Sequence, residues 1–339
     1  MKQIKIRYQY FRYRLSSLAA IEQDSQVRNF FYVLLRKNGL LKHIIESVFR
    51  KRPNLTDEHL AYLLFAALQY LTDFEYDHLA KKQIKNRLDK DIPTFSKQII
   101  EICQNNNLST QVPNRYSALQ VALATMQKPN KSIIDLGCSA GWGLMALNSE
   151  LLRNFSSSDI RIVNLANKPV DLGRVVGLDS SSGIKDLRWL SACIFPEIKE
   201  KRNNLFQLWN LLKAQEAKVE TLHMDVKNII NNNDLEKRFD IVWTSSTLYQ
   251  IGNTFDESFS EIRPALEFLL SPNGIWIDAY YKKWDIDFAS VDNPYQFTIY
   301  QNGNFDKPLI FLKSDSDNVF NLEAGENFEE SLTVLESIG

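Results

Sequence analysis

Apolar residues in the first part of the chain recur with the period of an α-helix. Ile4, Tyr8, Phe11, Leu15 and Leu18 are spaced by three or four residues, which places them on one helix face. Thr56 resembles a helix N-cap, because acidic residues follow it and favour the first turn. Residues 1–127 are therefore predicted to be almost wholly helical, with helices near 25–37, 40–51, 56–70, 95–104 and 115–127.

The pattern changes at Lys131, where short apolar runs begin to alternate with helical stretches. This alternation indicates a parallel sheet with helices on both faces. Two last strands flank Asn302-Gly303-Asn304 and predict an antiparallel hairpin. Residues 128–339 are thus expected to form an α/β domain, a Rossmann-like three-layer sandwich with a mostly parallel seven-stranded sheet. The predicted strands are 132–136, 175–179, 219–224, 239–244, 274–280, 296–300 and 309–313, with helices near 141–153, 184–216 and 257–270.

Composition excludes several classes of protein. The 339 residues are 44% hydrophobic and 24% charged, and the low numbers of glycine (12) and proline (10) exclude collagen-like and low-complexity chains. Three isolated cysteines form neither a disulfide framework nor a CxxC metal site, so a reducing, cytoplasmic compartment is expected. The longest uncharged apolar stretch, 59–72, is too short to span a bilayer. The histidines form no HxxxH pair, and no metal site is predicted.

Charge divides the chain unevenly. Residues 1–110 carry 18 Lys and Arg against 11 Asp and Glu, whereas the remainder carries 22 against 30. Opposite signs suggest two units that dock on each other, joined near the polar run 105–107 and Pro113. We expect the N-terminal helices to form a cap over the open carboxyl ends of the strands, where a ligand would bind. The competing interpretation is a basic region that recruits nucleic acid.

Residues 132–143, Ser-Ile-Ile-Asp-Leu-Gly-Cys-Ser-Ala-Gly-Trp-Gly, combine a strand, a glycine turn and a helix start. Gly137 and Gly141 allow a ligand to approach the backbone, and the following helix offers free N–H groups. The spacing differs from the G-x-G-x-x-G of dinucleotide-binding folds. Asp135, two residues before the first glycine, would repel a pyrophosphate but suits an amine-bearing ligand.

This arrangement resembles the first motif of the class I S-adenosylmethionine-dependent methyltransferases. The resemblance implies that Asp135 and the turn with Gly137, Ser139 and Gly141 hold the methionine part of S-adenosyl-L-methionine. It implies that Asp179, at the end of the second strand, accepts both ribose hydroxyls. Because Asp179 lies 44 residues beyond Asp135, a second strand at about 160–166 stays open as an alternative.

The later strands extend the same resemblance. It implies that Asp225 and the Val226 N–H bind the adenine, and that Thr244 and Ser245 on the fourth strand complete the cofactor site. More narrowly, residues 8–280 resemble one uncharacterised bacterial family with a helical N-terminal region and a methyltransferase-like core. That family often has a histidine where this chain has Thr244. The resembling segments are 53–54, 66–71, 139–141, 188–190 and 195–197.

The resemblance implies methyl transfer to an oxygen or nitrogen of a small-molecule acceptor. His223, Tyr249 and Tyr280 are candidate general bases. One alternative is a nucleic-acid or translation-factor methyltransferase that uses the basic N-terminal region. The loop after the fourth strand lacks the Asn/Asp-Pro-Pro-Tyr and Pro-Cys sequences of resembling base methyltransferases, so nucleic acid is the less expected acceptor. The other alternative is a non-catalytic binding or interaction module on the same fold.

Overall fold

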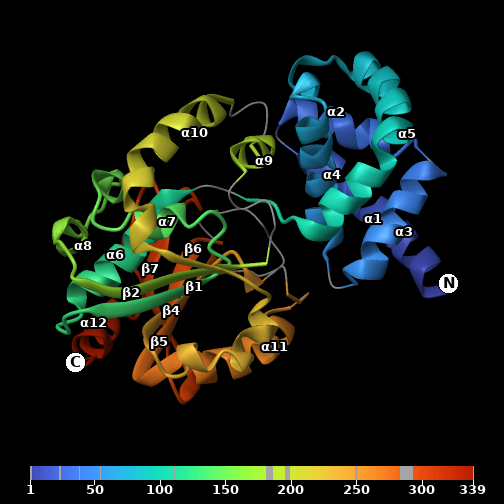
Figure 1. The fold of residues 1–339 in the computed structure, drawn as a ribbon. Coiled ribbons are helices and arrows are strands. Elements are labelled where there is room, and N and C mark those ends of the chain that lie inside the picture. Colours follow the sequence, from blue (N-terminus) through green and yellow to red (C-terminus); the bar gives the residue numbers. More distant parts are fainter. Residues whose placement is uncertain are drawn as a thin grey trace. The chain divides into compact units, whose positions relative to one another are not determined.

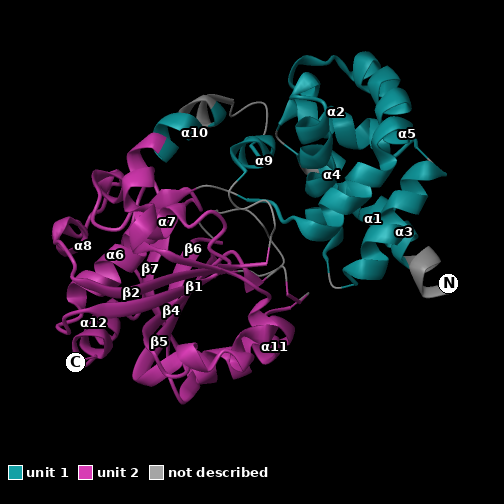
Figure 2. Ribbon diagram, in the orientation of Figure 1, with its two compact units in different colours: residues 1–110, 181–209 teal, residues 111–180, 210–339 magenta. Residues whose placement is uncertain are grey.

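The computed structural model describes residues 2–22, 24–37, 39–53, 55–109, 112–180, 186–194, 199–248, 251–252, 254–282 and 293–338. The chain forms two compact units (Figure 2). Unit 1 comprises Met1–Thr110 and Ser181–Trp209, and unit 2 comprises Gln111–Ser180 and Asn210–Gly339. A segment from the middle of the sequence therefore belongs to the unit that the N-terminal helices form.

Unit 1 is helical in its described part (Figure 1). The predicted cap is confirmed, because the Thr56 side chain accepts a hydrogen bond from the His59 N–H at 3.1 Å. The helix predicted at 95–104 begins much earlier and continues through Pro93. The main helices are α1 (Lys2–Ile21), α2 (Ser25–Leu34), α3 (Leu40–Lys51), α4 (Asp57–Leu71), α5 (Lys81–Asn105), α9 (Leu187–Ala192) and, as far as Trp209, α10 (Lys199–Leu212).

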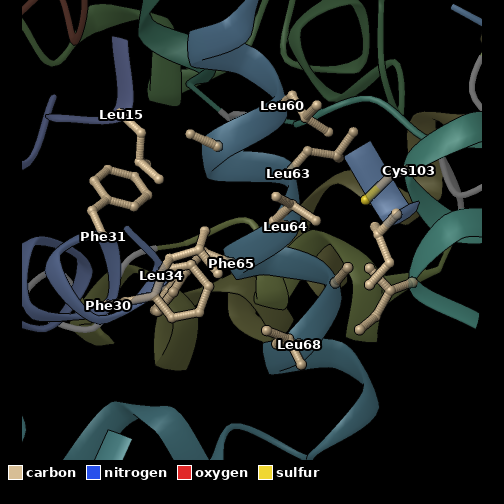
Figure 3. Close-up of a cluster of buried hydrophobic side chains, with 14 of the residues drawn as sticks. Leu15, Phe30, Phe31, Leu34, Leu60, Leu63, Leu64, Phe65, Leu68 and Cys103 are labelled. Atoms are coloured by element: carbon tan, nitrogen blue, oxygen red, sulfur yellow. The ribbon is translucent and has the colours of Figure 1, made fainter. Parts of the chain in front are cut away.

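The core of unit 1 forms around α4. Leu60, Leu63, Leu64 and Leu68 lie along this helix and are buried, with Phe30 of α2 among their neighbours (Figure 3). The apolar stripe predicted for α1 is confirmed where its side chains are described, because all of these residues are buried: Tyr8, Phe11, Leu15 and Leu18. Helix α4 is apolar on most of its surface, and such a helix is stable only when other elements surround it.

The segment 181–209 is packed into unit 1 by its own side chains. Trp189 is 1% exposed and belongs to the hydrophobic cluster of the N-terminal helices. Its indole N–H donates to the Asn107 carbonyl at 3.2 Å, and the Tyr70 hydroxyl donates to the Asp186 carboxylate at 2.8 Å. These contacts make the segment a structural part of unit 1.

Unit 2 contains one sheet, with eight strands in the described part of the chain, in the order β3-β2-β1-β4-β5-β6-β7-β8. The first five in this order are parallel, and the last three continue antiparallel. The predicted count of seven strands is wrong because β8 has two residues, too few to show a period in sequence. The strands are β1 (Lys131–Leu136), β2 (Leu172–Asp179), β3 (Glu220–His223), β4 (Phe239–Ser245), β5 (Leu270–Tyr281), β6 (Tyr295–Gln301), β7 (Asn304–Ser314) and β8 (Glu323–Ala324).

Helices cover both faces of this sheet (Figure 1). Val242 packs in the cluster that includes α11 (Phe255–Leu269), whereas the next residue, Trp243, packs on Tyr116 of α6 (Tyr116–Thr125). Since neighbouring strand residues point to opposite faces, α11 and α6 lie on opposite sides. Helices α8 (Ile160–Asn167) and α12 (Phe328–Glu336) pack with α6.

Two local predictions are corrected. Residues 160–167 form helix α8, so the alternative second strand at about 160–166 is wrong. The helix expected over 141–153 is divided into α7 (Trp142–Met145) and a 3₁₀ helix at Glu150–Arg153. Asn148, between them, has a positive φ of 67°, which an α-helix does not accommodate. In the part of the chain that the structure describes, no helix is long and apolar enough to cross a membrane.

Candidate functional site

The site lies in unit 2 at the carboxyl ends of β1 and β4. These neighbouring strands lie where the strand order reverses, and such switch points form crevices in parallel sheets. The turn after β1 and the loop after β4 meet there. A Cβ on Gly137 would lie 2.3 Å from Thr247 Oγ1, and Gly137 has φ +95°. Position 137 therefore requires glycine for both space and backbone conformation.

The glycine turn is hydrogen-bonded to the end of β2. The Gly137 N–H donates to the Leu178 carbonyl at 2.7 Å, and the Ser139 N–H donates to Asp179 Oδ2 at 2.9 Å. Gly141, with φ 73°, precedes the first residue of α7. Strand β2 ends at Asp179, as predicted, and brings this carboxylate to the turn despite the 40 residues between Ser139 and Asp179.

Asp135 lies beneath the same turn and is fully buried. Its Oδ2 accepts a hydrogen bond from the Tyr116 hydroxyl, and its Oδ1 has no hydrogen-bond partner within the described ranges. Burial raises the pKa of Asp135 to about 7; the Tyr116 hydrogen bond opposes this rise, and the Asp179 charge adds to it. Tyr116 was not among the predicted site residues, because it lies 19 positions before Asp135 and no local pattern relates the two.

The Thr244 side chain forms two hydrogen bonds inside the sheet. Its buried hydroxyl donates to Asp278 Oδ1 at 2.6 Å and accepts from the Trp276 indole N–H at 2.8 Å. Burial raises the pKa of Asp278 to about 7, and the hydrogen bond from Thr244 opposes this rise. Asp278 was also missed, since its place opposite Thr244 is set by the register of β4 against β5.

Ser245 belongs to a group of hydroxyls at the end of β4. The fully buried Tyr295 hydroxyl lies 3.3 Å from Ser245 Oγ and 3.0 Å from Ser246 Oγ. The Arg115 guanidinium lies 5.5 Å from the centre of the Tyr295 ring and donates to the Asp317 carbonyl at 2.8 Å. Residues from three distant parts of the sequence thus support the loop after β4.

The remaining predicted residues lie on β3, after it, or on β5. His223 is exposed at the end of β3, where it pairs in register with Asp179. Asp225 is exposed, and its side chain accepts from the Lys227 N–H at 2.9 Å, so it caps the 3₁₀ helix Val226–Asn231. Tyr280 is buried near the end of β5. Tyr249 lies outside the described residues.

A pocket of about 430 Å³ opens elsewhere in unit 2. Its lining is mainly apolar and includes Leu144, Met145, Leu172, Val175 and Val219. None of the predicted site residues lines it among those that the structure describes. Two of the lining residues, Met145 and Val219, nevertheless lie close to the turn, since each has an atom 3.8 Å from where a Cβ on Gly141 would be.

The chain matches no protein-family model and no curated protein. Among solved structures, it is similar to a SAM-dependent methyltransferase from Thiobacillus denitrificans in complex with S-adenosyl-L-homocysteine, with 16% identity, coverage of 52% of each chain and a TM-score of 0.28. It is also similar to Haemonchus contortus phosphoethanolamine N-methyltransferase 2, with 16% identity, coverage of 64% of this chain and 35% of that one, and a TM-score of 0.31.

Spermidine synthase from Thermotoga maritima is similar as well, with 13% identity, coverage of 54% of this chain and 50% of that one, and a TM-score of 0.31. The chain spans about half the length of the first of these structures. Assignment of a function therefore rests on the geometry of the chain's own site.

Proposed function

We propose that unit 2 binds S-adenosyl-L-methionine at the glycine turn and transfers its methyl group to an oxygen or nitrogen of a small-molecule acceptor. The observation that carries this proposal is the Ser139 N–H bound to Asp179 at 2.9 Å, which joins the turn after β1 to the acidic end of β2. This bond and the Asp135 carboxyl place two acidic groups beside a turn with three positive φ angles: 95° at Gly137, 52° at Ser139 and 73° at Gly141.

The residues present fit this cofactor. Asp135 Oδ1 is a buried acceptor without a partner among the described atoms, and an ammonium group supplies the donors that such an oxygen requires. Asp179, at the strand end, is a carboxylate able to accept two parallel hydrogen bonds from neighbouring hydroxyls. When bound, the cofactor supplies an electrophilic methyl group on its sulfonium.

The protein's own contribution would be mainly to position the acceptor in line with that methyl group. The hydroxyls of Ser245 and Ser246 lie at the carboxyl end of β4, where they contact the Tyr295 hydroxyl of β6. His223 and Tyr280 remain our candidates for removing the acceptor proton, and Tyr249 is a third candidate outside the described residues. Asp225 and Val226 remain the proposed adenine contacts.

Calorimetry with S-adenosyl-L-homocysteine on the full chain tests cofactor binding. Asp179→Ala should weaken binding by about 1.5–3 kcal/mol, roughly 10- to 150-fold, the range for hydrogen bonds to a charged group. The matched control is Asp159→Ala, which removes another carboxylate of unit 2 that accepts a backbone hydrogen bond, from the Arg161 N–H at 2.9 Å. This control should bind like the wild type. If the protein binds NAD but does not bind S-adenosyl-L-homocysteine, the proposal is refuted.

The acceptor class needs a separate measurement. We would incubate the protein with cellular extract and methyl-labelled S-adenosylmethionine, and separate small molecules, RNA and protein. We expect the label in the small-molecule fraction. Label in RNA or protein would instead support the nucleic-acid or translation-factor alternative. Cofactor binding without transfer to any fraction would support the non-catalytic module.

Some basic residues of unit 1 form ion pairs with acidic residues of the same unit. With the segment 181–209 included, unit 1 carries 23 Lys and Arg against 14 Asp and Glu. Arg14, however, pairs with Glu58, and Arg87 pairs with Asp91. These internal ion pairs weigh against an open cationic surface for nucleic acid. That the N-terminal helices cap the acceptor site stays a prediction.

A further inference from the structure

Tyr116 reaches Asp135 through space that glycine leaves open. A Cβ on Gly143, in the first turn of α7, would lie 1.9 Å from Tyr116 Cε2. The absence of that atom allows the phenol ring to lie between α7 and Trp243, whose ring centre is 5.5 Å away. The Tyr116 ring is thus held on two sides, with its hydroxyl bonded to Asp135 Oδ2.

The groups that face Asp135 come from three elements. Tyr116 of α6 donates the hydrogen bond, Asp179 of β2 adds a negative charge, and Cys138 lies in the turn. Burial raises the pKa of Cys138 well above its usual value, so it remains a neutral thiol near pH 7. Burial and the neighbouring Asp135 also raise the pKa of Tyr116, which keeps its proton and stays a donor; Arg115 opposes that rise.

We propose that Tyr116 is a positioning residue that favours the ionised form of Asp135 and leaves its Oδ1 as the acceptor for the cofactor's amino group, directly or through one water. This inference rests on the proposed function. The phenol gives the buried carboxylate a donor that favours its charged form. It also occupies Oδ2, so that Oδ1 is the oxygen left for a ligand. Gly143 is part of the same arrangement, because a larger residue would displace the ring.

The sign of the pH dependence follows from this arrangement. A cationic amino group binds the charged form of Asp135, and the pKa of Asp135 is raised to about 7. Affinity should therefore fall as the pH decreases through about 7. Removal of the Tyr116 hydroxyl takes away an interaction that lowers this pKa. The midpoint of the affinity loss should then move to higher pH.

The test is calorimetric titration of the full chain with S-adenosyl-L-homocysteine between pH 5.5 and 8.5. For Tyr116→Phe we expect the midpoint to rise by about one pH unit, which corresponds to roughly fivefold weaker binding at pH 7. The affinity should return to within about twofold of the wild type at pH 8.5. This recovery also shows that the variant is folded. Gly143→Ala should shift the midpoint in the same direction.

Tyr76→Phe is the matched control. Its hydroxyl makes the same kind of buried bond, to Asp91 Oδ2 at 3.0 Å, but in unit 1. This variant should leave the midpoint unchanged. If wild-type protein binds no S-adenosyl-L-homocysteine at any pH, the proposed function fails and this inference fails with it. If wild-type protein binds and Tyr116→Phe is equally weaker at every pH, or unchanged, only the role of Tyr116 is refuted.

Discussion

At the residue scale, Asp135 and Asp278 are buried carboxyl groups of unit 2 with different surroundings. Asp135 has one tyrosine donor and an oxygen without a described partner, whereas Asp278 accepts from Thr244 within the sheet. Burial raises the pKa of each to about 7. Asp278 faces a hydroxyl that is itself bonded to Trp276, so a structural role explains its contacts.

The first prediction concerns Asp278 and stability. Its folded-state pKa lies above the unfolded value, so its contribution is fully present below about pH 4 and is lost as the pH rises through about 7. The free-energy difference of unfolding between wild type and Asp278→Asn should therefore decrease over this window, by up to about 4 kcal/mol. Urea titrations followed by tryptophan fluorescence at several pH values measure it.

Thr244→Val provides a second arm of the same experiment. It removes the donor that favours the Asp278 carboxylate, so the pH window should move upward. It also leaves the Trp276 N–H without this acceptor, which should cost about 1–3 kcal/mol. If the difference in unfolding free energy between the wild type and Asp278→Asn stays constant from pH 4 to 7, the prediction is contradicted.

At the element scale, backbone carbonyls at the end of helix α5 accept hydrogen bonds from a side chain that follows another helix. Arg52, directly after α3, donates to the carbonyls of Cys103 at 3.1 Å and Asn106 at 2.8 Å, near the end of α5. The last carbonyls of a helix have no partner within it. Burial lowers the pKa of Arg52 from its usual value, which indicates that the guanidinium is partly removed from water.

The second prediction is that Arg52→Met destabilises unit 1 by about 1–3 kcal/mol, because partly buried carbonyls lose their donor. Arg50→Met is the control, since Arg50 lies on the same helix end and is exposed. Hydrogen exchange at the end of α5, read by mass spectrometry, should quicken for Arg52→Met but not for Arg50→Met. Equal exchange in the two variants would contradict the role given to Arg52.

At the scale of the whole molecule, the chain passes between the two units at three places along the sequence, and two of these are close in sequence to residues of the candidate site. One passage, at Thr110–Gln111, precedes Tyr116 by a few residues, and another follows Asp179 after Ser180. The residues that contact the glycine turn are thus connected along the chain to unit 1 at both places. The two units also differ in the sign of their net charge, because unit 2 carries 17 Lys and Arg against 27 Asp and Glu.

The third prediction is that Trp189→Ala loosens the N-terminal helices, although Trp189 lies far from them in sequence. Removing this buried ring should cost about 3–5 kcal/mol. Limited proteolysis should then cut within residues 1–110 more readily. Phe206→Ala is the control, because Phe206 belongs to unit 1 but is 56% exposed. Unchanged proteolysis of Trp189→Ala would show that the Trp189 ring is not needed for the stability of unit 1.

Periodic and local features were predictable from sequence. The buried stripe of α1, the Thr56 cap and the end of β2 at Asp179 each depend on neighbouring residues. Helix α8 was ambiguous because Ile160–Asn167 is short and apolar enough to read as a strand. The strand β8 was missed because two residues show no period.

The α/β class, the parallel strands and the glycine turn with Asp135 and Asp179 could be predicted from local patterns, because hydrophobic period and backbone conformation are local properties. Three relations could be known only from the folded chain: 181–209 packs into unit 1, Tyr116 donates to Asp135, and Asp278 lies opposite Thr244. These relations join residues distant in sequence. Strand register and side-chain packing select them, and neither is visible in a local pattern.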